Sequence, residues 1–190
     1  MAELTAVEAR TVLARAFADD PLMVWFFPDD EVRPHACAAM FGLFAEHYLS
    51  SGRVDVVRRG SPVAVAMWQW PGGDDQGSES LPTLPGLIAA LMGAGRAAEV
   101  GGAMAVLRDL RPPGPHAYLH LLGVDPSCRG EGLGGRLLDE GIAAARAAGL
   151  DTHLDTMNPA NVPFYAAHGL SVRHETALAG GPSVWSMATG

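Results

Sequence analysis

Lysine is absent from this chain of 190 residues, so all 13 of its basic side chains are arginine. This absence excludes Schiff-base chemistry on a lysine and the phosphate-binding loop that ends in Gly-Lys-Ser or Gly-Lys-Thr. Cysteine is also scarce, because Cys37 and Cys128 allow at most one disulfide and no multi-cysteine metal site. The seven histidines have no ligand-like spacing, and we therefore expect no metal.

Basic charge and long apolar runs are missing too. The formal net charge is −8, which argues against nucleic-acid binding and favours cationic partners. The most apolar stretch, residues 84–95, is shorter than the roughly 20 residues needed to span a bilayer. Residues 1–15 mix charged and apolar side chains, unlike a signal or transit peptide. We expect a cytoplasmic protein with no membrane partner.

The composition is that of a folded domain, with 48% hydrophobic and 18% charged residues. We expect one domain over residues 1–190, in which helices and strands interleave as an α/β or α+β protein. Residues 22–28 are expected to form an aromatic connection, and residues 71–80 a loop. The patterns predict helices over 4–18, 34–50, 85–110, 132–148 and 159–168, and strands over 54–58, 62–70, 116–124, 150–156, 170–176 and 183–187.

The strongest chemical signal is the glycine-rich segment 129–135, which lies between a predicted strand and a predicted helix. Glycine permits positive φ and lets a ligand approach the backbone closely. The first amides of the following helix lack internal partners and point outward at the positive end of the helix dipole. The segment is therefore suited to bind a pyrophosphate, although a plain loop would show the same glycines.

A dinucleotide-binding unit would place its glycines after the first strand of the domain. Here they lie two-thirds of the way along the chain, and Arg129 precedes them. The stretch Arg129–Gly134 instead resembles the Arg/Gln-x-x-Gly-x-Gly/Ala signature of the GCN5-related N-acetyltransferases (GNAT). Residues 158–170, with Asn158, Phe164-Tyr165 and Gly169, are similar to the second motif of that family.

Within the family, the sequence looks most like puromycin N-acetyltransferase and its relatives. The segment Ala16–Pro21, the strand end Trp68-Gln69-Trp70 and the stretch Leu154–Thr156 carry this resemblance. Asp155 and Leu170 depart from it, since the relatives more often carry Glu and Phe at these positions. The first strand of the family fold is also poorly visible, because the chain starts almost directly in a helix.

The resemblance implies a GNAT fold, with a mixed, twisted sheet of six to seven strands flanked by helices. Two parallel strands would splay apart to hold acetyl-CoA, which acts as acyl donor without a metal. A homodimer is possible by analogy alone. The implied coenzyme-binding residues are Leu122, Gly123, Val124, Arg129, Gly130, Glu131, Gly132, Leu133, Gly134, Gly135, Asn158 and Asn161.

Three residues are catalytic candidates. The resemblance makes Tyr165 the general acid that protonates the leaving thiolate. His120, whose unperturbed pKa lies near 6.5, is the first candidate base and predicts that kcat/KM rises between about pH 6 and 7.5. Asp155 is its rival, and it would attract a cationic substrate even without taking a proton.

The acceptor is expected to be the primary amine of a small molecule, an antibiotic or a metabolite, bound in an aromatic pocket of Trp25, Phe26 and Trp68. One alternative is a protein N-terminus or lysine as acceptor, which would need an open groove. A second alternative is a non-catalytic acyl-CoA-binding domain.

Overall fold

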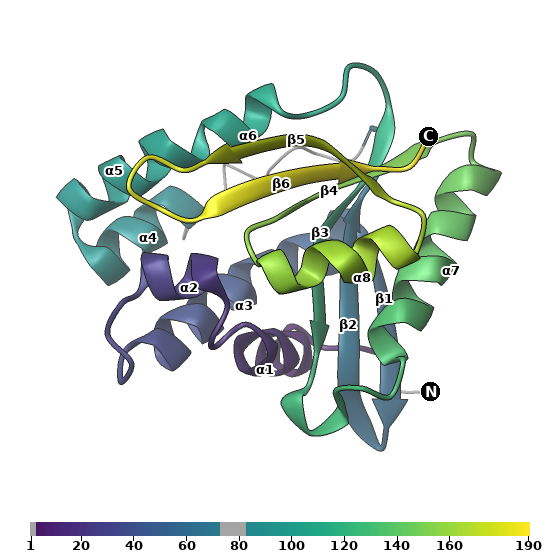
Figure 1. The fold of residues 1–190 in the computed structure, drawn as a ribbon. Helices are drawn as coiled ribbons and strands as arrows, with labels where there is room; N and C mark the ends of the chain where they lie inside the picture. Colours follow the sequence, from purple (N-terminus) through teal and green to yellow (C-terminus); the bar gives the residue numbers. More distant parts are fainter. Residues whose placement is uncertain (1–2, 73–82) are drawn as a thin grey trace.

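The structure of the protein, a computed structural model, describes residues 3–72 and 83–190. Within these residues, three helices are followed by two strands and three more helices; strands and helices then alternate until two consecutive strands end the chain (Figure 1). The helices and 3-10 turns are α1 (Ala6–Ala16), α2 (Pro21–Phe26), α3 (Arg33–Ser51), α4 (Leu84–Met92), α5 (Ala94–Met104), α6 (Val106–Asp109), η1 (Pro126–Cys128), α7 (Leu133–Ala147), η2 (Pro159–Asn161) and α8 (Val162–Ala167).

Six strands form one sheet in the order β1-β2-β3-β4-β6-β5. Only the β3–β4 pair is parallel among the five pairings, so the sheet is mixed. The strands are β1 (Arg53–Arg59), β2 (Ser61–Gln69), β3 (His116–Val124), β4 (Asp151–Thr156), β5 (Ser171–Ala177) and β6 (Ser183–Ala188).

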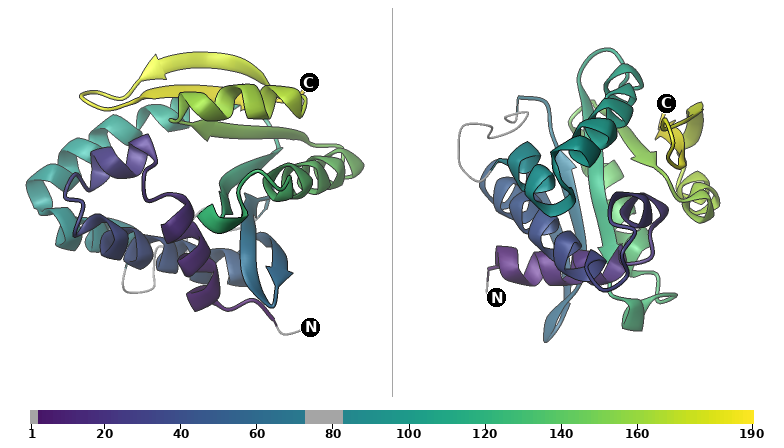
Figure 2. Two further views of the ribbon diagram at one scale, coloured as in Figure 1. Left: turned by 60° about the horizontal axis from the view of Figure 1, so that its bottom comes forward. Right: turned by 90° about the vertical axis from the view of Figure 1, so that its left-hand side faces the viewer.

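Helices cover both faces of the sheet (Figure 2). One apolar cluster packs α1, α2 and α3 against Val65, Met67 and Leu121, which belong to β2 and β3. The other packs α7 and α8 against Ala66 and Trp68 of β2. We call these the α3 face and the α7 face. Alternate residues of β2 supply the two clusters, as strand geometry requires.

A β-bulge interrupts β3 at His120. Met67 of β2 pairs with Leu121, and the next residue, Trp68, pairs with Leu119, so His120 is the extra residue. Leu119 belongs to the α7-face cluster and Leu121 to the α3-face cluster, although residues two apart in a regular strand share a face. Because of the bulge, residues two apart on either side of His120 point to opposite faces of the sheet.

The parallel strands β3 and β4 separate soon after they meet. Their pairing runs from His116 with Asp151 to Tyr118 with His153 and stops there. Beyond this point, within the described residues, β4 pairs only with β6 and β3 pairs only with β2. In Figure 1, β1–β3 run vertically while β5 and β6 lie across the view. The sheet therefore has a V-shaped gap whose apex is the Tyr118–His153 pair.

The expected helices and strands are observed with shifts of a residue or two at their ends, and 85–110 is divided into α4, α5 and α6. The expectation of an aromatic connection over 22–28 is wrong for most of that segment. Asp20 caps a short helix, α2, that begins at Pro21 and ends at Phe26. No strand precedes α1 within the described residues. Most of the loop expected at 71–80 lies outside the described residues. None of the helices within 3–72 and 83–190 is long and apolar enough to cross a membrane.

Candidate active site

The glycine-rich segment lies between β3 and α7, at the open end of the gap. Gly130 and Gly132 have φ values of +80° and +76°, the left-handed region that favours glycine, and a Cβ at either position would meet nothing within 4 Å. No side chain caps α7 at Gly132, and the first helical bond joins the Arg136 amide to the Gly132 carbonyl. The amides of residues 133–135 are therefore unused helix donors, as an anion site requires.

Three polar contacts hold this loop in place. Arg129 donates to the carbonyl of Ala16 at the end of α1, with a distance of 2.8 Å. Asp125, before η1, pairs with Arg15 at 3.1 Å. Glu131 pairs with Arg59, which lies on the β1–β2 hairpin. Arg129 and Glu131 thus brace the loop with their side chains, and this leaves backbone amides as the principal donors for phosphates.

The next predicted coenzyme residues differ in what surrounds them. Leu133 is 9% exposed and its side chain packs in the α7-face cluster. A Cβ at Gly134 would lie 3.4 Å from Val124, an ordinary contact. A Cβ at Gly135 would lie 2.8 Å from the His168 ring, which would have to move. The lack of a side chain at Gly135 therefore makes room for the His168 ring, whereas the fold has space for a Cβ at Gly134.

The predicted pantetheine-binding residues line the β3 edge of the gap. Leu122 and Val124 pack with the α7-face cluster. Gly123 faces α1, where a Cβ would lie 3.0 Å from Leu13 and 3.1 Å from Ala16. Gly123 thus allows α1 to pack closely on β3, while the β3 edge beyond Tyr118 lacks a partner strand among the described residues.

His120, the bulged residue, faces α3 inside an aromatic cage. Its Nδ1 lies 2.8 Å from the hydroxyl of Tyr48, and its ring stacks on Tyr118 and meets the edge of Phe44. Burial lowers the pKa of His120 from 6.5 to about 4, and the positive charge of Arg111 acts in the same direction. His120 is therefore neutral at pH 7, so it can accept a proton but holds it weakly.

Asp155 lies across the apex from His120. The hydroxyl of Tyr118 donates to its Oδ2 at 3.2 Å, and the Nε2 of His153 lies 3.5 Å from its Oδ1. The side chain is 2% exposed, and Oδ1 has no hydrogen-bond partner among the described residues. A buried carboxylate oxygen without a donor is costly, so this atom is available to a cationic or N–H-bearing ligand.

Tyr165 comes from α8 on the other face. It is 8% exposed and packs in the α7-face cluster. Burial raises its pKa well above 10, and the negative charge of Asp20 acts the same way. The phenol therefore stays protonated at neutral pH, as a general acid must. Asp20 itself has its pKa raised by burial, although the Leu22 amide and the Asn158 side chain donate to it.

The two predicted asparagines have structural roles. Asn158 caps η2, since its Oδ1 accepts from the Ala160 amide at 3.0 Å. Asn161 reaches back to the Thr156 hydroxyl at 3.4 Å. Both lie between β4 and α8, on the β4 side of the gap.

The aromatic pocket expected from Trp25, Phe26 and Trp68 is not formed by these three residues. Trp68 is 0% exposed and packs against Gly141 of α7, which excludes it from an open pocket on the α3 face. Phe26 is 7% exposed, in the core beside Trp25. Trp25 is half-buried, and the Arg96 guanidinium lies 4.9 Å from its ring centre. Alternation along β2 puts Trp68 in the α7 cluster, whereas Trp25 stays a candidate.

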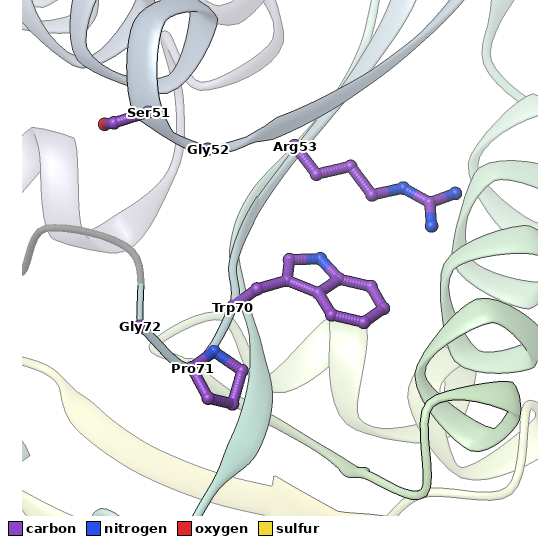
Figure 3. A pocket seen from close by; sticks show the side chains of 6 residues that line it. All are labelled: Ser51, Gly52, Arg53, Trp70, Pro71 and Gly72. Carbon is purple, nitrogen blue, oxygen red and sulfur yellow. The ribbon is translucent and has the colours of Figure 1, made fainter.

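Two surface hollows lie near the end of β2. The larger, of about 410 Å³, is lined by Ser51–Arg53 and Trp70–Gly72, with the Arg53 side chain beside the Trp70 indole (Figure 3). The smaller, of about 190 Å³, includes Tyr118 in its wall. Neither contains His120 or Tyr165. No group of three or more His, Cys, Asp or Glu side chains in the described part of the chain could hold a metal ion.

The sequence interpretation missed three residues of this site: Tyr48, Tyr118 and Asp20. Tyr118 is two residues before His120 in β3, so alternation alone would have predicted that they share a face. Tyr48 belongs to the apolar stripe of α3, which gave no sign that its hydroxyl meets His120 from 72 positions away. Asp20 precedes a proline, where a helix cap is the ordinary interpretation.

The chain is similar to known acetyltransferases in sequence and in fold. Residues 86–170 match the Acetyltransferase (GNAT) family. The histone acetyltransferase HPA2 and related acetyltransferase structure from Corynebacterium glutamicum is 25% identical, with a TM-score of 0.72 over 100% of this chain and 93% of that chain.

Two further structures share the fold. A mosquito arylalkylamine N-acetyltransferase like 5b is 16% identical, with a TM-score of 0.57 over 96% of this chain and 93% of that one. The ribosomal-protein-S18-alanine N-acetyltransferase of Escherichia coli is 17% identical, with a TM-score of 0.54 over 99% and 90%.

The fold, the gap and these matches define an acetyltransferase. Residues 86–170 match the GNAT family and the whole chain has the GNAT fold, as the two sequence motifs had indicated. The closer resemblance to puromycin N-acetyltransferase is not confirmed by these comparisons and stays a prediction.

Proposed function

We propose that this enzyme transfers the acetyl group of acetyl-CoA to the primary amine of a small molecule by direct attack. The observation that carries the proposal is the gap between β3 and β4. It has unused amides at its open end and a buried imidazole and carboxylate at its apex. These are the groups that an anionic donor and a cationic acceptor would require.

The residues present fit acetyl-CoA. The amides of Leu133, Gly134 and Gly135 would bind its pyrophosphate, because a helix N-terminus favours negative charge and no Cβ blocks the turn. The β3 edge from Leu122 to Val124 would pair with the pantetheine arm in the gap. When bound, acetyl-CoA supplies a thioester carbonyl that an amine can attack.

His120 and Asp155 would prepare the amine. An alkylamine with a pKa near 10 is almost entirely cationic at pH 7, so its binding is favoured by the unpartnered Oδ1 of Asp155. The ammonium must lose one proton before its nitrogen has a lone pair with which to attack, and neutral His120 would accept that proton. Since burial holds the pKa of His120 at about 4, the imidazole would pass the proton on rather than keep it.

Tyr165 would protonate the sulfur when the bond from carbon to sulfur breaks. Its raised pKa keeps the phenol protonated until the thiolate appears. Asp20 discourages the phenolate by its charge, which favours prompt reprotonation.

The depth of the site favours a small amine over a protein. His120 lies beneath Phe44 and Tyr48 of α3, and the Asp155 side chain is nearly inaccessible, so a slim amine reaches them more easily than a peptide. The structural relatives do not choose, because they include acetyltransferases named for an arylalkylamine and for a ribosomal protein.

The proposal is tested by acetyl-CoA turnover, read as thiol release against a panel of amines that includes puromycin, with lysine-containing and free N-terminal peptides beside them. Release with small amines supports the proposal, and release with peptides alone supports the protein acetyltransferase. Tight acetyl-CoA binding without turnover on any acceptor would favour the non-catalytic alternative.

A further inference from the structure

Tyr118 closes the apex of the gap. It belongs to the last backbone pair between β3 and β4, and its hydroxyl reaches Asp155, two residues beyond that pair on β4. This hydrogen bond ties the strands together at the point where their backbones separate. The side chain therefore bridges the narrow end of the gap on the α3 face.

The Tyr118 ring is held on several sides. It stacks on His120 with ring centres 5.7 Å apart and lies 5.4 Å from the ring of His153. The guanidinium carbon of Arg111 lies 5.4 Å from its centre. These ring contacts and the tethered hydroxyl hold the side chain in place, so it forms a wall at the apex.

A hollow lies beyond this wall. Its volume is about 190 Å³, and Tyr118 lines it together with Trp70, Arg111 and His116. On the opposite face the apex is blocked by Leu119 and Leu154, which are 3% and 1% exposed in the α7-face cluster. The Tyr118 side chain is therefore what separates the apex from the nearest open space.

The two ends of the gap are chemically different. The far end of β3 is Val124, which lies six residues or roughly 20 Å along the strand from Tyr118. The unused amides of α7 follow this end of the strand in the chain. If the pyrophosphate binds there, as the proposed function requires, the acyl end of the donor must point toward Tyr118. The arm has no other direction within the gap.

We propose that Tyr118 sets the acyl chain length of the donor, by stopping the acyl group of a short-chain acyl-CoA at the apex. This inference rests on the proposed function for the placement of the coenzyme. An acetyl group ends before the ring, whereas the added methylenes of a butyryl group would be forced against it. Overpacking of this kind is unfavourable because neighbouring groups must shift.

The test is calorimetric binding of CoA, acetyl-CoA and butyryl-CoA to the wild type, Tyr118→Phe and Tyr118→Ala, without an acceptor. The wild type should bind butyryl-CoA at least about tenfold more weakly than acetyl-CoA. Tyr118→Ala opens the apex to the hollow, so the two affinities should come within about twofold. Tyr118→Phe keeps the ring and should retain most of the discrimination.

Free CoA is the matched control ligand, because it lacks the acyl group and should bind all three proteins alike. If Tyr118→Ala does not fold, Tyr118→Leu serves in its place, since it keeps a branched apolar side chain on the strand. Equal affinities for acetyl-CoA and butyryl-CoA in the wild type would overturn the inference. So would an unchanged ratio in a folded, truncated variant. Failure of the wild type to bind CoA at all is a different result, and it would overturn the proposed function as well.

Discussion

The buried imidazole of His120 should make the stability of this protein depend on pH. Its pKa is about 4 in the folded protein and 6.5 without the fold. Between these values the unfolded chain binds a proton that the folded chain does not, so stability falls as pH falls from 6.5 toward 4. At pH 5 the two pKa values correspond to a loss of about 2 kcal/mol relative to pH 7 or above.

The perturbation that isolates this effect is His120→Gln, which removes the titrating ring and keeps a polar side chain. The free energy of unfolding would be measured in urea at pH 7 and pH 5 for both proteins. The variant should lose about 2 kcal/mol less than the wild type between the two pH values. Because each protein is compared with itself, any constant cost of the substitution cancels. His35→Gln, at an exposed position, is the matched control.

An equal pH dependence in the wild type and His120→Gln would refute this reasoning, as would an NMR titration of His120 centred near pH 6.5. The same pKa revises the kinetic expectation from the sequence. If His120 is the base, the acid limb of kcat/KM lies near pH 4 instead of between 6 and 7.5. Any rise above pH 7 then belongs to the amine itself.

Three further predictions concern the acid, the anion site and the acceptor. Tyr165→Phe keeps the packing but lacks the proton, so kcat should fall about 10²-fold with little change in acetyl-CoA affinity; a kcat within twofold of wild type, with chemistry rate-limiting, would exclude Tyr165 as the acid. Gly134→Val should abolish coenzyme binding, measured by calorimetry, because the added side chain would stand where the phosphates bind. The fold, checked by circular dichroism, should persist, because a Cβ there makes only an ordinary contact with Val124. Unchanged affinity of folded Gly134→Val for the coenzyme would contradict the predicted anion site. Gly132→Val should in addition strain the loop, since φ at Gly132 is +76°. Asp155→Asn should raise KM for cationic amines more than for weakly basic ones, and an equal rise for both classes would show that the carboxylate does not bind the ammonium.

The local features of this protein follow from its sequence. The period of apolar residues located most helices and strands. The glycine-rich segment 129–135 between a strand and a helix predicts an anion site, and this stays a prediction. These signals need only neighbours a few residues apart. Local reasoning failed for Trp68, which was expected in the acceptor pocket. The neighbours of a strand residue depend on which element packs on its face of the sheet, and α7 packs on the face where Trp68 lies.

The apex of the gap was decided by tertiary structure alone. The bulge at His120 depends on the register between β2 and β3, whose pairing residues are 49 to 60 positions apart. Tyr48, Tyr118 and Asp155 meet there from one helix and two strands, so no spacing in the sequence could announce them. The lowered pKa of His120 has the same origin, since the cage that removes water from the imidazole exists only when α3 covers the sheet.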